Sequence, residues 1–222
     1  MRFISLKLKI ALAAGVLSFL IIVAISTNNA LYIRDGSREA GEKELIAQAQ
    51  AVAWYVRSEI EVAVDIAQLL ATACSTTKDA DATFSITREQ LNVILQKTLM
   101  SNDQIHAVYC AWEPDAFDGM DAAYAGLGGH DESGRFVPSW HRNSQGQPEL
   151  RALVDYNNQE IAHYYFVPKA TGKQAVIGPY LCDETVIVSV SVPVWRQEAF
   201  VGVFGVDIGV EDLQKRLSQR FA

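Results

Sequence analysis

A run of alternating valines places the strongest constraint on what this chain can fold into. Every second residue from Val186 to Val194 is Val, and the residues between them are mostly small or polar, among them Ser189 and Ser191. This period of two is typical of a β-strand that buries one face. We therefore predict a strand whose valines pack on a core and whose other face remains available.

A second strand follows after a short turn and carries a lone carboxylate. The segment Phe200–Ile208 places Phe204 and Val206 on one face and Asp207 on the other. We expect Gly202 and Gly205 to lie on the same face as Asp207. Glycine in a strand often marks a place where another group comes close to the backbone. This second strand is therefore a candidate wall of a binding site.

The rest of the chain predicts an α+β domain. The expected elements, in chain order, are a helix over 36–73, a helix over 87–101, strands over 105–112 and 135–142, a short helix over 159–169, and a closing helix over 210–221. Thr87 and Gln90 suit a capping box at the start of the second helix. The loop 113–134 has the length of a functional or mobile segment. We predict a PAS-like mixed antiparallel sheet with helices on one side.

The N-terminus predicts a membrane anchor. Residues 10–26 carry no charge and come close to the ~20 residues that span a bilayer. Arg2, Lys7 and Lys9 precede this run, so the positive-inside rule places the N-terminus in the cytoplasm. A cleaved signal peptide is the alternative. The predicted organisation is a cytoplasmic end over 1–9, a transmembrane helix over 10–27, a stalk helix over 28–75 that continues from it with a weak point near 35–36, and a periplasmic or extracellular module over 76–222. We place the protein in the inner (plasma) membrane with a single span.

Composition and motifs exclude several classes of function. All 26 acidic residues but only part of the 19 basic residues follow residue 27, so the outer part carries a net charge of about −10. This charge argues against binding to nucleic acid or anionic lipid. Sequence motifs for nucleophilic, metal or nucleotide chemistry are missing, so we expect no enzyme activity, no cofactor and no metal. The acids Asp118, Asp121, Asp131 and Glu132 suit a solvated loop better than a calcium site. Cys110 and Cys182 either pair or remain free thiols.

Aromatic and charged residues in the second half of the chain predict a ligand pocket. Small-molecule pockets combine aromatic walls with a few polar groups, and aromatic faces also hold cations. The candidate ligand-binding residues are Trp140, Arg142, Tyr164, Tyr165, Tyr180, Asp183 and Asp207. The alternative is that most of these rings belong to an ordinary core. We expect the aromatic residues and Asp207 to form one pocket on the sheet face away from the long helix.

Several segments resemble the Cache-type sensor domains of bacterial chemoreceptors and sensor kinases. The segments are GPYLCDE, VSVSVPVW, AFVGVFGVDIGVEDL, WEPDAFDGMDAAYAG, GRFVPSW and YYFVPKATGK. The resemblance covers roughly residues 30 to 222. It is strongest to the membrane-distal half of the double-Cache domains of methyl-accepting chemotaxis proteins. It implies a receptor that binds a small molecule outside the membrane.

The same resemblance also indicates the chemical class of the ligand. Amino-acid-binding Cache sensors carry an R-x-W-Y motif, a Y-x-D motif and an aspartate in the last strand. Here Ala162 stands in place of the arginine and Cys182 in place of the first aspartate, whereas Asp207 matches the last one. The resemblance therefore implies an amine or amino-acid-like ligand rather than an ordinary α-amino acid. Arg142 leaves an organic acid as the weaker alternative.

These observations lead to one preferred function and three alternatives. We expect the sensory part of a transmembrane chemoreceptor that signals by helix displacement and forms a homodimer along residues 45–70. The alternatives are a tethered binding protein without signalling output, the sensor part of a histidine kinase or diguanylate cyclase, and a membrane-anchored enzyme. A receptor also needs an output domain, so we expect the 222 residues to be a fragment.

Overall fold

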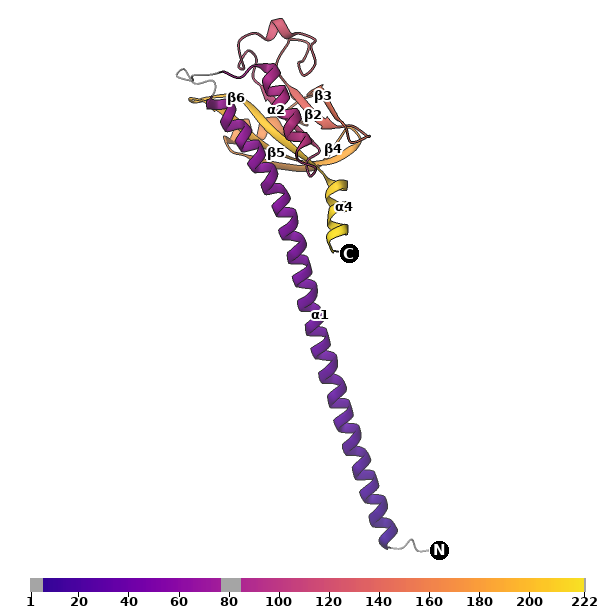
Figure 1. Cartoon of the computed structure of the whole chain (residues 1–222). Helices are drawn as coiled ribbons and strands as arrows, with labels where there is room; N and C mark the ends of the chain where they lie inside the picture. The colour runs from indigo at the N-terminus through magenta and orange to yellow at the C-terminus, as the bar shows by residue number, and fades with distance from the viewer. Residues whose placement is uncertain (1–5, 77–84, 222) are drawn as a thin grey trace. The chain divides into compact units, whose positions relative to one another are not determined.

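The computed structural model describes residues 6–76 and 85–221, apart from the side chains of residues 6–17, 29–37 and 39. The helices are α1 (Leu6–Thr76), α2 (Arg88–Met100), the 3₁₀ turn η1 (Asp121–Tyr124), α3 (His163–Thr171) and α4 (Val210–Phe221) (Figure 1). The strands are β1 (Ala107–Trp112), β2 (Pro138–Arg142), β3 (Pro148–Ala152), β4 (Ala175–Cys182), β5 (Thr185–Arg196) and β6 (Ala199–Gly209). The chain divides into two compact units, residues 1–53 and 54–222.

Helix α1 contains the whole of the predicted helix over 36–73 and runs without a break through residues 35 and 36, where a weak point was expected. Within the ranges given above, no helix combines the length and the apolar character that a membrane span requires. The predicted span over 10–27 falls partly on residues whose side chains lie outside the described part of the chain. That span remains a prediction.

Six strands form one sheet in the order β3-β2-β1-β6-β5-β4, and every neighbouring pair runs antiparallel. The predicted hairpin is confirmed as β5 and β6, which pair from Ile187 opposite Gly209 to Arg196 opposite Ala199. Strands β3 and β4 at the two edges were not predicted. Because residues that are opposite each other in an antiparallel pair share a face, the register also assigns each side chain to one side of the sheet.

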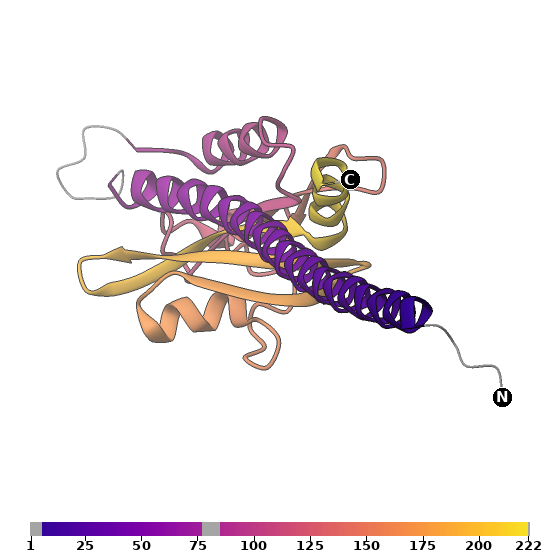
Figure 2. The same ribbon diagram turned by 90° about the horizontal axis from the view of Figure 1, so that it is seen from below.

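Helices cover both faces of this sheet, which corrects the prediction that they lie on one side. Figure 2 shows α2 (magenta) and the end of α1 on one side of β5 and β6, and α3 (orange) on the other. The larger apolar core lies under α1 and α2 and includes Leu95, Val108, Val190 and Val206, all fully buried. A smaller cluster that includes Tyr109 and Tyr165 lies under α3.

Two predicted helices are confirmed with their local signals. Helix α2 begins at Arg88, and both hydrogen bonds of the capping box between Thr87 and Gln90 are present. Helix α4 spans Val210–Phe221 as predicted, directly after β6. Helix α4 therefore starts three residues after Asp207. Cys110 and Cys182 are free thiols, the first buried and the second exposed.

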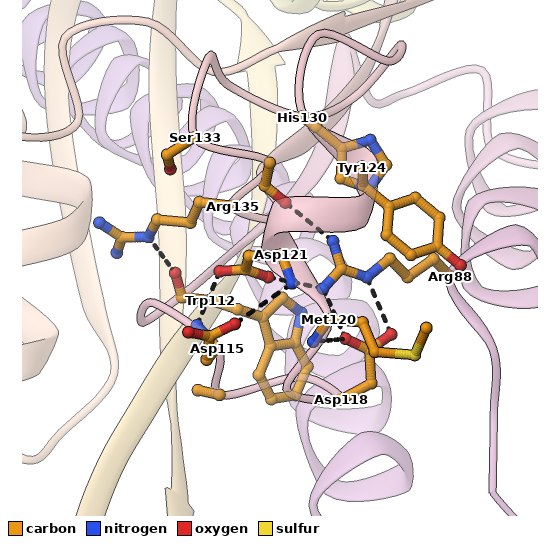
Figure 3. Close-up of polar contacts among 12 residues, drawn as sticks. Arg88, Trp112, Asp115, Asp118, Met120, Asp121, Tyr124, His130, Ser133 and Arg135 are labelled. Carbon is orange, nitrogen blue, oxygen red and sulfur yellow. Dashed lines mark hydrogen bonds and ion pairs between the residues drawn. The ribbon is translucent and has the colours of Figure 1, made fainter.

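The long loop 113–134 is held in place by a buried arginine (Figure 3). Arg88 is 1% exposed and its guanidinium donates to Asp118 at 2.6 and 2.9 Å, to Asp121 at 2.5 Å and to the carbonyl oxygen of Gly134 at 2.9 Å. The same group lies 4.3 Å from the ring centre of Tyr124. Two of the four acids considered for a calcium site are therefore the ion-pair partners of a buried arginine. This corrects the solvated loop expected there, because this part of the loop is packed in the domain.

Candidate functional site

A polar patch lies on the α3 side of strands β5 and β6, and Asp207 is at its centre. Ser189 is opposite Asp207 and Ser191 is opposite Gly205, so all four residues share one face. Ser189 and Ser191 are fully buried and Asp207 is 8% exposed. The alternation of valine and serine in β5 produces this arrangement, because the valines then occupy the other face.

Three tyrosines surround the patch. The hydroxyl of Tyr109 in β1 lies 3.0 Å from the hydroxyl of Ser191, and the hydroxyl of Tyr180 in β4 lies 2.7 Å from that of Ser189. The ring of Tyr164 from α3 packs edge-on against that of Tyr109, with the ring centres 5.4 Å apart. The site therefore collects side chains from β1, β4, β5, β6 and α3.

Gly205 makes room for one of these tyrosines. A Cβ atom at position 205 would lie 2.0 Å from the ring of Tyr109, so only glycine fits there. The expectation that Gly205 admits a ligand to the backbone is therefore corrected, because a tyrosine ring fills that space. Gly202 is opposite Trp112 and Val194 and lies on the other face of β6, away from Asp207. Its predicted place beside Asp207 is wrong because the two positions differ by an odd number of residues.

The carboxylate of Asp207 accepts a short hydrogen bond from the hydroxyl of Ser189. Within residues 6–76 and 85–221, no arginine, lysine or histidine forms an ion pair with it. Burial raises the pKa of Asp207 to about 7, and the hydrogen bond from Ser189 opposes the shift. The group can therefore be neutral or ionised near neutral pH, and a cation beside it would favour the charged form.

The tyrosines stay neutral at physiological pH. Burial raises the pKa of Tyr109, Tyr164 and Tyr180 well above the usual value, and the nearby Asp207 carboxylate raises each of them further. Each hydroxyl can therefore donate a hydrogen bond, and each ring presents a neutral aromatic face.

Of the seven candidate residues, the structure brings Tyr164, Tyr180 and Asp207 together. Trp140 and Arg142 lie on the opposite face, which corrects their expected place in the pocket. Trp140 is opposite Val108, packs against the core under α2 and donates to the side chain of Asn92 at 3.3 Å. Side chains of a strand alternate between faces, so residues 140 and 142 both point to the side away from Asp207.

Arg142 has a structural role on that side. Its guanidinium donates to the carbonyl oxygens of Leu99 at 2.8 Å, Ile105 at 3.2 Å and Asn102 at 3.3 Å. These acceptors include the last turn of α2, whose carbonyl groups have no partner within the helix. Arg142 therefore ties the end of α2 to the sheet.

The hydroxyl of Tyr165 has different polar partners from the hydroxyl of Tyr164, although both rings belong to the packing under α3. The Tyr165 hydroxyl bonds to the carboxylate of Glu113 and accepts from Arg135 at 2.6 Å, and Lys169 donates to the same carboxylate at 2.6 Å. Successive residues of a helix point about 100° apart, so neighbours in α3 need not face one ligand. Burial, and then the bond to Glu113, raises the pKa of Tyr165.

Asp183 lies in the turn between β4 and β5, where its carboxylate pairs with Arg151 at 3.4 Å. Three residues of the site were not predicted: Tyr109, Ser189 and Ser191. The sequence does indicate the two serines, since they are the polar positions in the alternation of valines. It does not indicate Tyr109, because all six residues of β1 are buried and the strand shows no polar face.

Comparison with known proteins identifies the family. The domain family described as "Methyl-accepting chemotaxis protein-like, first PDC sensor domain" matches residues 91–215. Among curated proteins, the methyl-accepting chemotaxis protein TlpQ of Pseudomonas aeruginosa is 27% identical in an alignment 143 residues long, which covers 57% of this chain and 20% of TlpQ. The chain thus spans about a fifth of that relative.

Solved structures give the same result. The extracellular domain of the histidine kinase mmHK1S-Z3 has a TM-score of 0.63 and 31% identity, covering 75% of this chain and 60% of that one. Methyl-accepting chemotaxis protein X has a TM-score of 0.65 and 27% identity, covering 78% and 64%. The sensory domain of the Campylobacter jejuni chemoreceptor Tlp3, at 17% identity and a TM-score of 0.51, shares the fold. The matched family covers more than half of the chain, and the chain therefore belongs to the first PDC sensor domains of the methyl-accepting chemotaxis protein type.

Proposed function

We propose that this sensor domain lies outside the cytoplasmic membrane as part of a transmembrane chemoreceptor, and that its Asp207 site binds a ligand through a positively charged amine. The proposal rests on the buried carboxylate of Asp207. Among the described residues, its hydrogen-bond partner is the uncharged hydroxyl group of Ser189. An ionised carboxylate in such a place is costly unless a cation pairs with it. A ligand ammonium group would supply that cation.

The aromatic surroundings favour the same ligand class. The rings of Tyr109, Tyr164 and Tyr180 lie around Asp207, and aromatic faces attract ammonium groups. Ala162, which is buried, offers no charge for a carboxylate. Arg142, the earlier candidate for binding an organic acid, is engaged by carbonyl groups on the other face. We therefore favour an amine or amino-acid-like ligand. Tlp3, whose likeness to this chain extends to the fold, has been solved with L-valine bound.

Signalling by helix displacement has a short physical path. Helix α4 begins directly after β6, and its Arg216 pairs with Glu59 of α1 at 2.9 Å. The ring of Phe221 also packs edge-on against Tyr55 of α1, with centres 6.3 Å apart. A ligand that shifts the end of β6 would move α4 against α1, which is the kind of small helix shift that receptors transmit.

A thermal-shift screen of the full chain with amines, amino acids and organic acids tests the ligand class. Amines that stabilise the wild type should lose roughly 1.5–3 kcal/mol of binding free energy in Asp207→Asn. This loss corresponds to about ten- to a hundredfold in affinity. Asp103→Asn is the matched control, because the Asp103 side chain is 99% exposed and lies near Arg142.

The proposal would be wrong if organic acids alone stabilise the domain and Asp207→Asn leaves their binding unchanged. Membrane anchoring is tested separately by carbonate extraction of membranes from expressing cells. Recovery of the unprocessed chain in the soluble fraction would contradict the predicted anchor over 10–27.

We also infer a homodimer along α1. Apolar side chains in the segment 45–70 are uncovered in one chain, since Leu45 is 67% exposed and Leu69 is 71% exposed. Leu69 also lines an apolar groove between α1 and α2, together with Ile66, Val93 and Ile94. Disulfide crosslinking of single cysteines introduced along 45–70 should give yields with helical periodicity, and uniformly low yields would count against this interface.

A histidine kinase is the second candidate for the complete protein, because mmHK1S-Z3 is 31% identical and shares the fold. Both candidates use the same sensor domain and differ in the output domain. The coding sequence that adjoins this one distinguishes them: a methyl-accepting coiled coil supports the chemoreceptor, and a kinase domain supports the alternative.

A further inference from the structure

An ion pair connects the two opposite edges of the sheet. Arg151 belongs to β3, the first strand in the order, and Asp183 lies in the turn after β4, the last strand. Their side chains are nevertheless 3.4 Å apart. Strands in a sheet are spaced about 4.8 Å, so a flat sheet would separate its two edge strands by roughly 24 Å. The tip of the β4–β5 hairpin therefore bends across one face of the sheet to meet β3.

The face that it crosses is the one that carries Asp207. Arg151 is opposite Ser139, Ser139 is opposite Tyr109, and Tyr109 is opposite Gly205. The side chain of Arg151 therefore lies on the same face of the sheet as Tyr109. In the next row, Glu149, His141, Ala107 and Asp207 follow one another across the same face.

The electrostatic environment of two further groups agrees with this placement. Burial lowers the pKa of His141, the charge of Arg151 lowers it further, and the charge of Asp183 raises it. Desolvation, followed by the charges of Asp207 and Asp183, raises the pKa of the Cys182 thiol to about 11, and Arg151 opposes this shift. The hairpin tip thus lies within electrostatic range of both the row of His141 and the Asp207 carboxylate.

Separating the side chains of Arg151 and Asp183 should cost little free energy. The side chains of Arg151 and Asp183 are 50% and 73% exposed, and Arg151 also pairs with Glu149 at 3.1 Å. Exposed ion pairs contribute little to stability. An interaction of this strength does not determine the fold of the sheet, but it can bias a hairpin tip between a closed and an open position.

We propose that Arg151 is a positioning residue which holds the β4–β5 turn, through Asp183, as a strap over the Asp207 site, and that molecules reach the site when this pair separates. The nature of the molecule that enters rests on the proposed function. The strap itself does not, and it can be tested without a ligand.

The test measures access to position 189, which is fully buried beside Asp207. Ser189→Cys in the full chain with Cys182→Ser places a thiol at the floor of the site, and iodoacetamide labelling of that position is followed by peptide mass spectrometry. Arg151→Glu and Asp183→Arg should each increase the labelling rate about two- to fivefold. The double charge swap Arg151→Glu with Asp183→Arg should bring the rate back to that of the parent.

The matched control is the swap Arg57→Glu with Glu61→Arg, an exposed ion pair on α1 at 2.7 Å, which should leave the rate unchanged. If Ser189→Cys does not fold, hydrogen exchange of the backbone amides of 181–186 in otherwise wild-type chains serves instead, with faster exchange in the single reversals and recovery in the swap. Single reversals without effect, or a swap that fails to restore the rate, would overturn the strap. A ligand screen without hits would weaken the proposed function and leave this result untouched.

Discussion

The two faces of the sheet use neighbouring residues of the same strands for opposite purposes. On the face under α1 and α2, Val108, Val190 and Val206 are apolar and fully buried, and removing apolar surface from water stabilises the fold by roughly 25 cal/mol per Å². On the face under α3, Ser189 and Asp207 are buried as well, but burial of polar groups costs free energy unless partners are found.

This contrast shows where the domain trades stability for function. The polar face could be filled with apolar residues, as the other face is, and the chain would be more stable. Instead it keeps a carboxylate whose pKa is raised to about 7 by burial. Natural proteins tolerate such costs at functional sites, so the difference between the faces supports the ligand site more directly than any single residue does.

The largest effect is expected for the buried cluster of Arg88, Asp118 and Asp121. Arg88→Met removes the partner of Asp118 and Asp121 and should destabilise the chain by about 3–5 kcal/mol, because breaking a buried ion pair leaves charges unpaired. Chemical denaturation measures the loss. Adding Asp118→Asn and Asp121→Asn to Arg88→Met should recover part of it. A cost below about 1 kcal/mol for Arg88→Met would show that the loop 113–134 is held mainly by other contacts.

On the apolar face, shortening a buried side chain should destabilise the domain. Leu95 on α2 is fully buried in the larger core, and Leu95→Ala should cost about 2–5 kcal/mol from lost burial and the remaining cavity. Val93→Ala on the exposed side of the same helix is the control, since Val93 is 53% exposed. Equal losses in the two variants, measured by urea unfolding, would contradict the assignment of the core.

On the polar face, a substitution at Asp207 should increase the stability of the domain, whereas the two substitutions above decrease it. Because the pKa of Asp207 is about 7 in the folded chain and lower when unfolded, its contribution to stability is fully present below about pH 4 and is lost as pH rises through 7. Asp207→Asn removes this loss, so the variant should be more stable than the wild type at pH 8, by an amount on the order of a few kcal/mol. Thermal unfolding from pH 4 to 8 measures it, and an equal pH dependence in both proteins would contradict a raised pKa.

The same titration predicts how ligand binding depends on pH. An ammonium ligand needs the ionised carboxylate, so its affinity should be constant above pH 7 and fall below it, approaching tenfold per pH unit. Calorimetric titration with an amine found in the screen gives the profile. In Asp207→Asn the slope should disappear, and a slope that persists there would assign the titration to another group.

Much of the fold follows from local sequence patterns. The alternation in Val186–Val194 predicts β5, the Thr87 capping box predicts the start of α2, and α4 has the predicted bounds. The edge strands were missed because their patterns are weak. Strand β3 has only five residues, begins with Pro148 and is only partly buried, and β4 contains Pro179, which edge strands tolerate because their backbone amides need no partner.

The site was predictable only in part, for a physical reason. A strand pattern assigns alternate residues to two faces, but it does not say which face of one strand joins which face of the next. That assignment depends on register: Trp140 is opposite Val108 and therefore lies with the apolar core, away from Asp207. Tyr109 joins the site only through its pairing with Gly205. Such pairings between distant segments leave no mark in either segment alone.

The smallest and most specific effect is expected for Tyr180→Phe. When Asp207 is ionised, the hydroxyl of Ser189 donates its one proton to that carboxylate, so Tyr180 is the donor in its 2.7 Å contact with Ser189. Losing this bond should change the stability of the domain by only about 0.5–1.5 kcal/mol.

The informative readout of this variant is the titration of Asp207. Without Tyr180 as a donor, Ser189 becomes a weaker donor to the carboxylate, so the pKa of Asp207 should move upward from about 7. Carboxyl NMR of selectively labelled protein reports it. Tyr164→Phe is the matched control within the same site, since its hydroxyl contacts the carbonyl oxygen of Val154 at 3.4 Å and neither Ser189 nor Asp207. An equal shift in both variants would mean that the hydroxyls act through general polarity, and that the chain from Tyr180 through Ser189 to Asp207 does not set the charge of the site.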